Sequence, residues 1–378
     1  MRNALAQTLM DLFAANTGLV GDKPPRRYLW TDSFAVCNFL GLARQTGDDH
    51  YLNLARRLVD QVHHVLGRHR DDDSRQGWIS GLPEKEGEKH PTHGGLRIGK
   101  SLNERGRDQP PDSQLEWDQD GQYFHYLTKW MHALHRMGLE TGENHYQHWA
   151  AELAASAHIA FTRKSFPGGP KRMVWKMSID LSRPLVASMG QHDPLDGLIT
   201  CLELQSTENN EAEERVDLAA AIADMTEMSA NGHWATDDPL GIGGLLDDAT
   251  RLAQLVFEHG VERHDLLHQL LVAAEISLRE FVRSPLLRRS ANHRLAFREL
   301  GLSIGIHGLR QISRWVARDR ELKAFNDRLL LFQPLADQIE TFWSDPAHRS
   351  GPMWIEHRDI NSVMLATSLA PAGYLWPG

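Results

Sequence analysis

The sequence predicts an all-α protein, an (α/α)6 barrel (toroid) of six helical hairpins. We expect a single domain over residues 1–378, with a long loop insertion at about 67–114. Three observations predict this fold. Apolar residues recur at the three-and-four spacing of a helical face. A helix–turn–helix unit repeats along the chain, and such repeats decide between architectures. There is no convincing run of alternating strand residues.

The repeat is clearest in the first two hairpins. Residues 46–51 (TGDDHY) match residues 141–146 (TGENHY), and each segment joins two amphipathic helices. Gly47 and Gly142 are suited to the left-handed position that follows a helix. The two segments therefore predict turns between helices at 31–45 and 50–69, and between a helix in 115–137 and one that follows 145. The segment between these hairpins, 67–114, is rich in glycine, proline and charge, which is typical of a functional or disordered loop.

The later hairpins follow the same order. Asp193-Pro194 and Asp238-Pro239 predict helix starts, with each aspartate as an N-cap. The expected helices outside the first two hairpins are 3–16, 193–207, 211–229, 239–260, 264–282, 295–317, 322–343 and 359–369. The first helix of a pair is apolar or rich in glycine, whereas the second carries more charge, which indicates an inner and an outer layer. Helix 3–16 is expected to close the ring against 359–369.

Composition excludes several classes of protein. The formal net charge of −9 argues against a nucleic-acid binder, which needs a basic surface. No window has the length of apolar sequence that a membrane span needs, and the N-terminus is not typical of a signal peptide. Cys37 and Cys201 lie in apolar helical patterns, which predicts reduced, buried thiols and a cytoplasmic protein. The oligomeric state is left open.

Acidic and aromatic residues gather before the predicted inner helices. In a toroid these helix starts meet at one end of the barrel, so they would form an acidic pocket with aromatic walls. Indole faces pack against the apolar face of a sugar ring, while carboxylates, arginine and histidine bind its hydroxyl groups. We therefore expect a sugar substrate. The predicted substrate-binding residues are Trp30, Trp117, Asp118, His192, Trp234, Arg298, Trp354 and His357.

Paired carboxylates are what glycosidic cleavage requires, one protonated and one ionised. Asp120 is the predicted acid, and Asp32 or Asp237 is the predicted second carboxylate. An aspartate at a helix start is also a capping residue, and this second interpretation stays open for all three. The HExxH motif and a close pairing of histidine with cysteine are absent, so we expect neither a metal site nor a cofactor.

The first hairpin, from Asp32-Ser33-Phe34 through Asn38-Phe39-Leu40 to Thr46-Gly47-Asp48, resembles that of the unsaturated glucuronyl and rhamnogalacturonyl hydrolases. These belong to the six-hairpin glycosidase-like superfamily. The resemblance implicates Asp32 in the sugar site, and more loosely Asp118 or Asp120 as the acid. This sequence differs from that family at residues 233–236 (HWAT), which lack the arginine and glycine of the family's WARG-type motif.

These observations predict a carbohydrate-active enzyme, a glycoside hydrolase that acts on a small or uronic-acid-containing sugar. One alternative is a sugar epimerase or isomerase of the N-acylglucosamine 2-epimerase type, with His192, His307 or His357 as the base. The other alternative is a toroid that binds a ligand without catalysis. It is favoured if the carboxylates at the helix starts are all engaged in capping.

Overall fold

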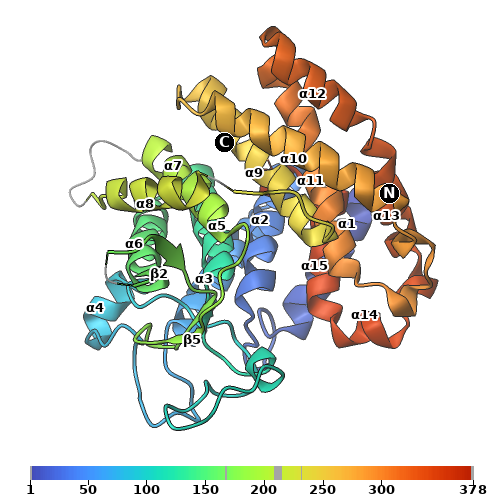
Figure 1. Ribbon diagram of the computed structural model, residues 1–378. Coiled ribbons are helices and arrows are strands. Elements are labelled where there is room, and N and C mark those ends of the chain that lie inside the picture. The colour runs from blue at the N-terminus through green and yellow to red at the C-terminus, as the bar shows by residue number, and fades with distance from the viewer. Residues whose placement is uncertain (1, 167, 208–214, 231, 376–378) are drawn as a thin grey trace. The chain divides into compact units, whose positions relative to one another are not determined.

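The computed structural model describes residues 2–375 except 167, 208–214 and 231, and these residues are mostly helical (Figure 1). The helices are α1 (Arg2–Asn16), α2 (Leu29–Thr46), α3 (Asp49–Leu66), α4 (Glu84–Lys89), α5 (Phe124–Thr141), α6 (Asn144–Phe161), α7 (Asp193–Thr207), α8 (Ala219–Ser229), α9 (Pro239–Glu258), α10 (His264–Arg283), α11 (Ala296–Trp315), α12 (Arg320–Leu330), α13 (Gln333–Ser344), α14 (Pro352–Glu356), α15 (Arg358–Leu369) and α16 (Ala372–Leu375). Across these residues, every helix is too short or too polar to cross a membrane.

The predicted hairpin turns are confirmed. Gly47 ends α2 with φ 69° and Gly142 ends α5 with φ 71°, so both adopt the left-handed conformation that glycine tolerates best. Asp48 caps α3 by accepting a hydrogen bond from the backbone N–H of His50. Cys37 and Cys201 are buried and are not joined by a disulfide, as predicted.

The structure corrects four predictions. Helix α5 begins at Phe124, so Asp118 and Asp120 precede it in a loop instead of lying at its N-terminus. The helix predicted at 322–343 is two helices, α12 and α13. Helix α8 begins at Ala219, and the predicted start at residue 211 lies outside the described residues. Strands also occur, and they are β1 (Gln122–Tyr123), β2 (Thr162–Lys164), β3 (Lys171–Met173), β4 (Lys176–Met177) and β5 (Pro184–Val186).

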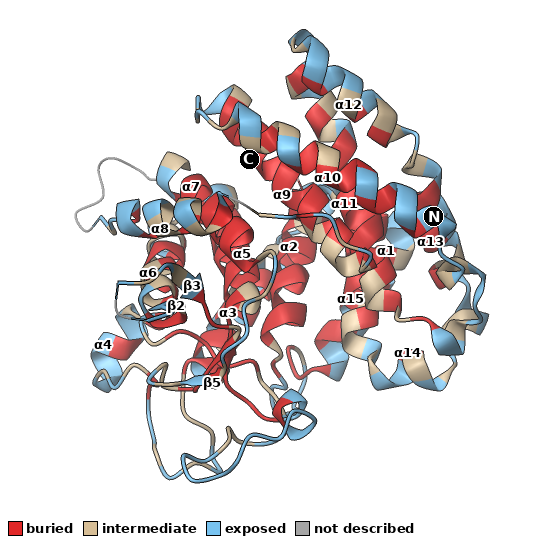
Figure 2. Ribbon diagram, in the orientation of Figure 1, coloured by how far each residue is buried: buried red, intermediate tan, exposed pale blue. Residues whose placement is uncertain are grey.

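The chain divides into two compact units. The N-terminal unit comprises Ala14–Ala43 and Gly47–Gly232, and the C-terminal unit comprises Met1–Phe13, Arg44–Thr46 and His233–Pro377. The division follows the hairpins, because the break at residue 232 falls just before the segment that leads into α9. Each unit has its own buried apolar interior (Figure 2).

In the N-terminal unit, α5 packs against both α6 and α7, and α7 packs against α8. Helix α5 is buried along most of its length, as the red ribbon in Figure 2 shows. Strand β1, directly before α5, pairs antiparallel with β4, which in turn pairs with β5. The pairing of Gln122 with Met177 and of Tyr123 with Lys176 therefore fixes the path by which the chain enters α5.

In the C-terminal unit, α9 and α11 approach each other closely at glycines. A Cβ atom on Gly243 would lie 2.2 Å from the carbonyl oxygen of Gly301, and one on Gly305 would lie 2.4 Å from that of Gly243. Such distances are impossible for a larger residue without movement of the backbone. Gly243, Gly301 and Gly305 therefore have a packing role inside these helices.

Candidate functional site

The candidate site in the N-terminal unit is built on the first turns of two adjacent helices, α5 and α7. His125 is the second residue of α5, and Asp193 is the first residue of α7. The Nδ1 atom of His125 lies 3.9 Å from Oδ1 of Asp193. Burial, followed by the negative charge of Asp196, raises the pKa of Asp193 to about 7. Burial lowers the pKa of His125 to about 4. Near pH 6 this pair is therefore a carboxylic acid beside a neutral imidazole.

A second carboxylate lies one turn further along α7. The Oδ2 atom of Asp196 accepts a hydrogen bond from the hydroxyl of Thr128 at 2.6 Å, and its Oδ1 atom accepts one from Nζ of Lys129 at 3.2 Å. All three side chains are buried. These donors stabilise the ionised form of Asp196. The two carboxylates of α7 thus have different surroundings, one holding a proton near neutral pH and one holding a charge.

Aromatic rings surround His125. The ring of Tyr123 stacks on the imidazole with centroids 5.4 Å apart, and the indole of Trp175 lies parallel to it at 6.1 Å. Trp30, at the start of α2, contacts it edge-on at 6.1 Å. Tyr126 packs against Trp30 at 5.3 Å. His125 and Trp175 are only partly buried, so the cluster reaches solvent on this side.

Several polar atoms of this cluster are buried without a hydrogen bond. Oδ2 of Asp193, Nδ1 of His125 and Nε1 of Trp30 have no hydrogen-bond partner within the described parts of the chain. Buried polar groups are nearly always paired, so three such atoms around one set of rings call for an explanation. They comprise an acceptor on Asp193, a donor on Trp30 and an imidazole nitrogen that can act as either. This combination suits a ligand that carries hydroxyl groups.

Asp120, the predicted catalytic acid, is fully buried in a different environment. Its Oδ2 atom accepts a hydrogen bond from Nη1 of Arg97 at 2.6 Å. Its Oδ1 atom accepts hydrogen bonds from the backbone N–H groups of Gly99 and Gly121, both at 3.0 Å. Arg70 lies at the edge of hydrogen-bond range, with its Nη1 atom 3.5 Å from Oδ2. Since both oxygens are occupied, this carboxylate is better suited to holding the loop around Gly99 than to proton transfer.

Asp32 also has a structural environment. Its Oδ2 atom accepts a hydrogen bond from the backbone N–H of Tyr28 at 2.8 Å, which satisfies a donor next to the start of α2. Its Oδ1 atom lies 3.5 Å from Nη1 of Arg27, and both side chains are buried. Asp32 is therefore not the N-cap of α2, which is Tyr28, but a residue of the first turn that binds the backbone N–H of the N-cap residue.

The other predicted residues of the N-terminal unit lie closer than Asp120 and Asp32 to the aromatic cluster around His125. Trp30 is part of it. Trp117 is about half exposed and packs edge-on against Trp175 at 5.1 Å, so it extends the row of rings toward solvent. His192 directly precedes Asp193. Asp118 is exposed beside Trp117. Trp30 and Trp117 thus lie at the cluster around His125, whereas Trp234 and Trp354 belong to the C-terminal unit.

The remaining predicted residues belong to the C-terminal unit. Asp238 caps α9, as predicted, by accepting from the backbone N–H of Gly241, and it also pairs with Arg298 at 2.7 Å. Asp237 is exposed beside it. Trp354 is buried and stacks on Trp343 at 5.6 Å. Of the two other predicted ligand residues in this unit, Trp234 is buried, and His357 is partly buried and contacts the ring of Phe297.

The sequence interpretation missed the central pair of the site. Asp193 was interpreted as an N-cap because proline follows it, but α7 begins at Asp193 itself, and one of its carboxylate oxygens is unpaired as described above. His125 was interpreted as part of the helix that follows Asp120. A signal for both was present: Asp193 and Asp196 occupy one turn of one helix, and His125 stands between two tyrosines at a helix start.

Comparison with known proteins supports the fold. The α-1,6-mannanase GH76A of Salegentibacter sp. HEL1_6 is similar over 98% of this chain and 99% of its own, with a TM-score of 0.56 and 12% identity. The GH76 α-mannanase of Bacteroides thetaiotaomicron is similar over 98% and 96%, with a TM-score of 0.56 and 10% identity. No protein-family model and no curated protein sequence matches the chain. These likenesses show the fold, an all-α (α/α)6 toroid, as the sequence predicted.

A third structure adds a bound sugar. It is an inactive variant of the Salegentibacter mannanase, in which two adjacent aspartates are replaced by asparagine, in complex with α-1,6-mannotriose. It is similar over 98% of this chain and 99% of its own, with a TM-score of 0.56 and 12% identity. In that protein, therefore, the fold binds an oligosaccharide.

Proposed function

We propose that the protein is a glycoside hydrolase whose general acid is Asp193, and that its substrate is a neutral, α-linked hexose oligosaccharide. The observation that carries the proposal is the state of Asp193: a buried carboxyl group with a pKa raised to about 7, one unpaired oxygen and aromatic rings around its imidazole neighbour. A glycosidase acid must be protonated near neutral pH, and burial beside a second carboxylate is how proteins achieve this.

The proposed chemistry divides two roles between the carboxylates of α7. Asp193 donates its proton to the glycosidic oxygen as the bond from that oxygen to the anomeric carbon breaks. The oxygen of a water molecule bonds to the anomeric carbon and becomes the hydroxyl group of the new reducing end. The water releases its other proton to the solvent, from which Asp193 is reprotonated. Asp196, held ionised by Thr128 and Lys129, keeps Asp193 protonated and offers negative charge near the positive charge that develops on the sugar ring.

The aromatic rings support a sugar as the ligand. Trp175 is partly exposed and Trp117 about half exposed, and their rings pack edge-on at 5.1 Å. Exposed indole faces bind the apolar face of a pyranose. The unpaired Nε1 of Trp30 and Nδ1 of His125 can hydrogen-bond hydroxyl groups of a bound sugar.

The neighbours in fold favour a neutral sugar over a uronic acid. They are named as α-1,6-mannanases and an α-mannanase, and one of them is complexed with α-1,6-mannotriose. A uronate would need a cation to bind its carboxylate, and Lys129, beside the two aspartates of α7, already pairs with Asp196. We therefore replace the uronic-acid substrate predicted from the sequence with an α-linked hexose oligosaccharide, α-1,6-mannosides first.

The test is hydrolysis of a panel of α-linked oligosaccharides, α-1,6-mannotriose and α-1,6-mannotetraose first, followed by chromatography of the products. We expect Asp193→Asn to lower kcat by about 10³-fold, the usual contribution of a general acid. Asp237→Asn is the matched control, because Asp237 is an exposed aspartate of the other unit. It should retain full activity.

Two results would contradict the proposal. Turnover by Asp193→Asn at the rate of the unaltered protein would exclude Asp193 as the acid. Tight binding of an oligosaccharide with no cleavage by the unaltered protein would exclude hydrolysis, and it would favour the ligand-binding alternative. The anomer first formed, followed by NMR, then decides between retention and inversion of configuration.

A further inference from the structure

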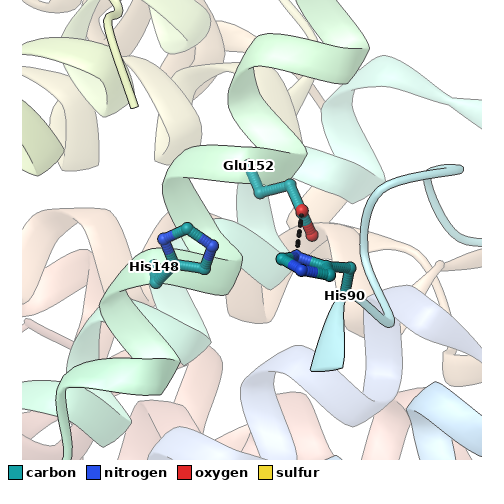
Figure 3. Close-up of side chains that lie close together, drawn as sticks. All are labelled: His90, His148 and Glu152. Atoms are coloured by element: carbon teal, nitrogen blue, oxygen red, sulfur yellow. Dashed lines mark hydrogen bonds and ion pairs between the residues drawn. The ribbon is translucent and has the colours of Figure 1, made fainter. Parts of the chain in front are cut away.

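A separate cluster of metal-binding side chains lies where the long loop meets α6. His148 and Glu152 are four residues apart on α6, so they share one face of the helix. His90 directly follows the short helix α4. The potential ligand atoms of these three residues all lie within 4.8 Å of one another. Figure 3 shows His148 and Glu152 on the helix and His90 on the facing loop, with a dashed line from His90 to Glu152.

The distances within the cluster suit a metal ion. Nδ1 of His90 lies 2.8 Å from Oε1 of Glu152, and Nδ1 of His93 lies 3.6 Å from the same oxygen. Around a tetrahedral ion with bonds of about 2.0–2.1 Å, two ligand atoms are about 3.3 Å apart. Small side-chain rotations therefore bring the atoms to coordination distance. His93 stands on the same turn of the loop as His90 and adds a third imidazole, so three histidines and one glutamate are available as ligands.

Neighbouring groups hold the carboxylate in place. The Oγ1 atom of Thr92, a fully buried residue, lies 2.9 Å from Oε2 of Glu152 and 2.9 Å from the carbonyl oxygen of Trp149. The indole N–H of Trp149 in turn donates to the carbonyl oxygen of Lys89 at 2.8 Å. These contacts join the loop to α6 on both sides of His90, and they leave Oε1 directed toward the histidines. Such outer contacts typically orient the ligands of a metal site.

We propose that His90, His148 and Glu152, with His93 as the fourth ligand, bind one divalent transition-metal ion of the zinc class. Imidazole nitrogens with a single carboxylate favour zinc, cobalt or nickel over magnesium and calcium, which prefer sites made of oxygen. The ion ties the loop that carries Arg97 and Asp120 to α6. None of its ligands belongs to the cluster around Asp193, so the proposal does not depend on the proposed hydrolase activity.

The experiment is a titration of the chelator-treated, full-length protein with Co²⁺, followed by displacement with Zn²⁺. We expect one Co²⁺ per chain with the intense visible absorption of tetrahedral Co²⁺, and loss of this absorption when Zn²⁺ is added. His90→Ala and His148→Ala should each weaken binding at least 100-fold. Thr92→Val, which removes only the outer hydroxyl, should weaken it about 10-fold. Mg²⁺ should not compete.

His64→Ala is the matched control. Its imidazole also lies beside carboxylates, with Nε2 3.0 Å from Glu88 and Nδ1 3.3 Å from Asp60. This variant should bind Co²⁺ with unchanged affinity and stoichiometry. If His148→Ala fails to fold, as judged by circular dichroism, Glu152→Gln provides the same test with a side chain of nearly the same size. Failure of the unaltered protein to bind one equivalent, or an equal loss in the His64 variant, would overturn the proposal.

Discussion

Asp120 and Asp193 are both buried aspartates of the N-terminal unit, yet their surroundings differ. The carboxylate of Asp120 receives hydrogen bonds from the guanidinium of Arg97 and from two backbone N–H groups. That of Asp193 has an unpaired oxygen, a neutral histidine at 3.9 Å and the negative charge of Asp196 nearby. Both oxygens of the first accept hydrogen bonds, whereas burial and the charge of Asp196 raise the pKa of the second.

The difference shows that burial alone does not identify a functional carboxylate. A buried carboxylate with a cation and several donors is part of the structure, because its charge is compensated and its oxygens are taken. A buried carboxylate that lacks such partners costs stability when it ionises, and folds retain such groups chiefly at functional sites. The two aspartates can therefore be separated by measuring stability and activity in parallel.

The largest expected effect on stability is at the Arg97–Asp120 pair. Asp120→Asn leaves the buried guanidinium of Arg97 without its counter-charge, and it should lower the free energy of unfolding by about 3–5 kcal/mol. Asp193→Asn should lower it much less, because burial and the charge of Asp196 outweigh the contributions of Lys129 and the Gly190 backbone to an ionised Asp193. Urea denaturation of both variants at pH 7.5 measures the difference.

A double variant makes this test specific. If the loss arises from the unpaired charge of Arg97, then Arg97→Met combined with Asp120→Asn should be more stable than the sum of the two single changes implies. Equal losses from Asp120→Asn and Asp193→Asn would mean that both aspartates are structural, and the contrast between them would be wrong.

The second effect is the pH dependence of stability. The folded-state pKa of Asp193, about 7, lies above the ordinary value of 3.8, so the folded protein binds a proton that the unfolded chain has released. Stability from this group is therefore fully present below about pH 4 and is lost as the pH rises through 7. With 1.36 kcal/mol per pKa unit, the loss is at most about 4 kcal/mol.

The pKa shift of His125 changes the stability of the fold with pH in the opposite direction. Its folded-state pKa of about 4 lies below the ordinary 6.5, so this group favours folding increasingly as the pH rises from 4 to 6.5. Between pH 4 and 6.5 the effects of Asp193 and His125 on stability oppose each other. Between about pH 6.5 and 7.5 only the effect of Asp193 changes stability. We expect Asp193→Asn to be less stable relative to the unaltered protein at pH 5.5 than at pH 8. Melting temperatures from pH 5 to 8.5 test this, and a constant difference would contradict it.

Local patterns in the sequence were enough to predict the hairpins. A helical face, a glycine after a helix and an aspartate before proline act over a few residues, and Gly47, Gly142 and Asp238 have the predicted conformations or contacts. Two of the tryptophans that were predicted from helix starts, Trp30 and Trp117, contact rings of the cluster around His125, and their role in binding sugar stays a prediction. The hairpin turns and the positions of these tryptophans at helix starts both depend on residues that are near one another in the chain.

The choice of acid was not predictable in the same way. Whether a carboxylate is paired depends on partners distant in sequence: Arg97 reaches Asp120 from the long loop, and His125 meets Asp193 from another hairpin. A motif of acidic and aromatic residues around Asp120 is equally consistent with a site and with an ion pair. The same limit applies to His90 and Glu152, which are 62 residues apart.

The smallest expected effect concerns the exposed rings. Trp175→Ala removes the indole that lies parallel to His125 and edge-on to Trp117. An aromatic contact contributes about 1 kcal/mol, so KM for an oligosaccharide should rise about five-fold while kcat changes little. Trp315→Ala, a tryptophan of the other unit, is the control. A fall in kcat without a change in KM would show that Trp175 positions His125 and Asp193 for proton transfer, and does not act as a platform for the sugar.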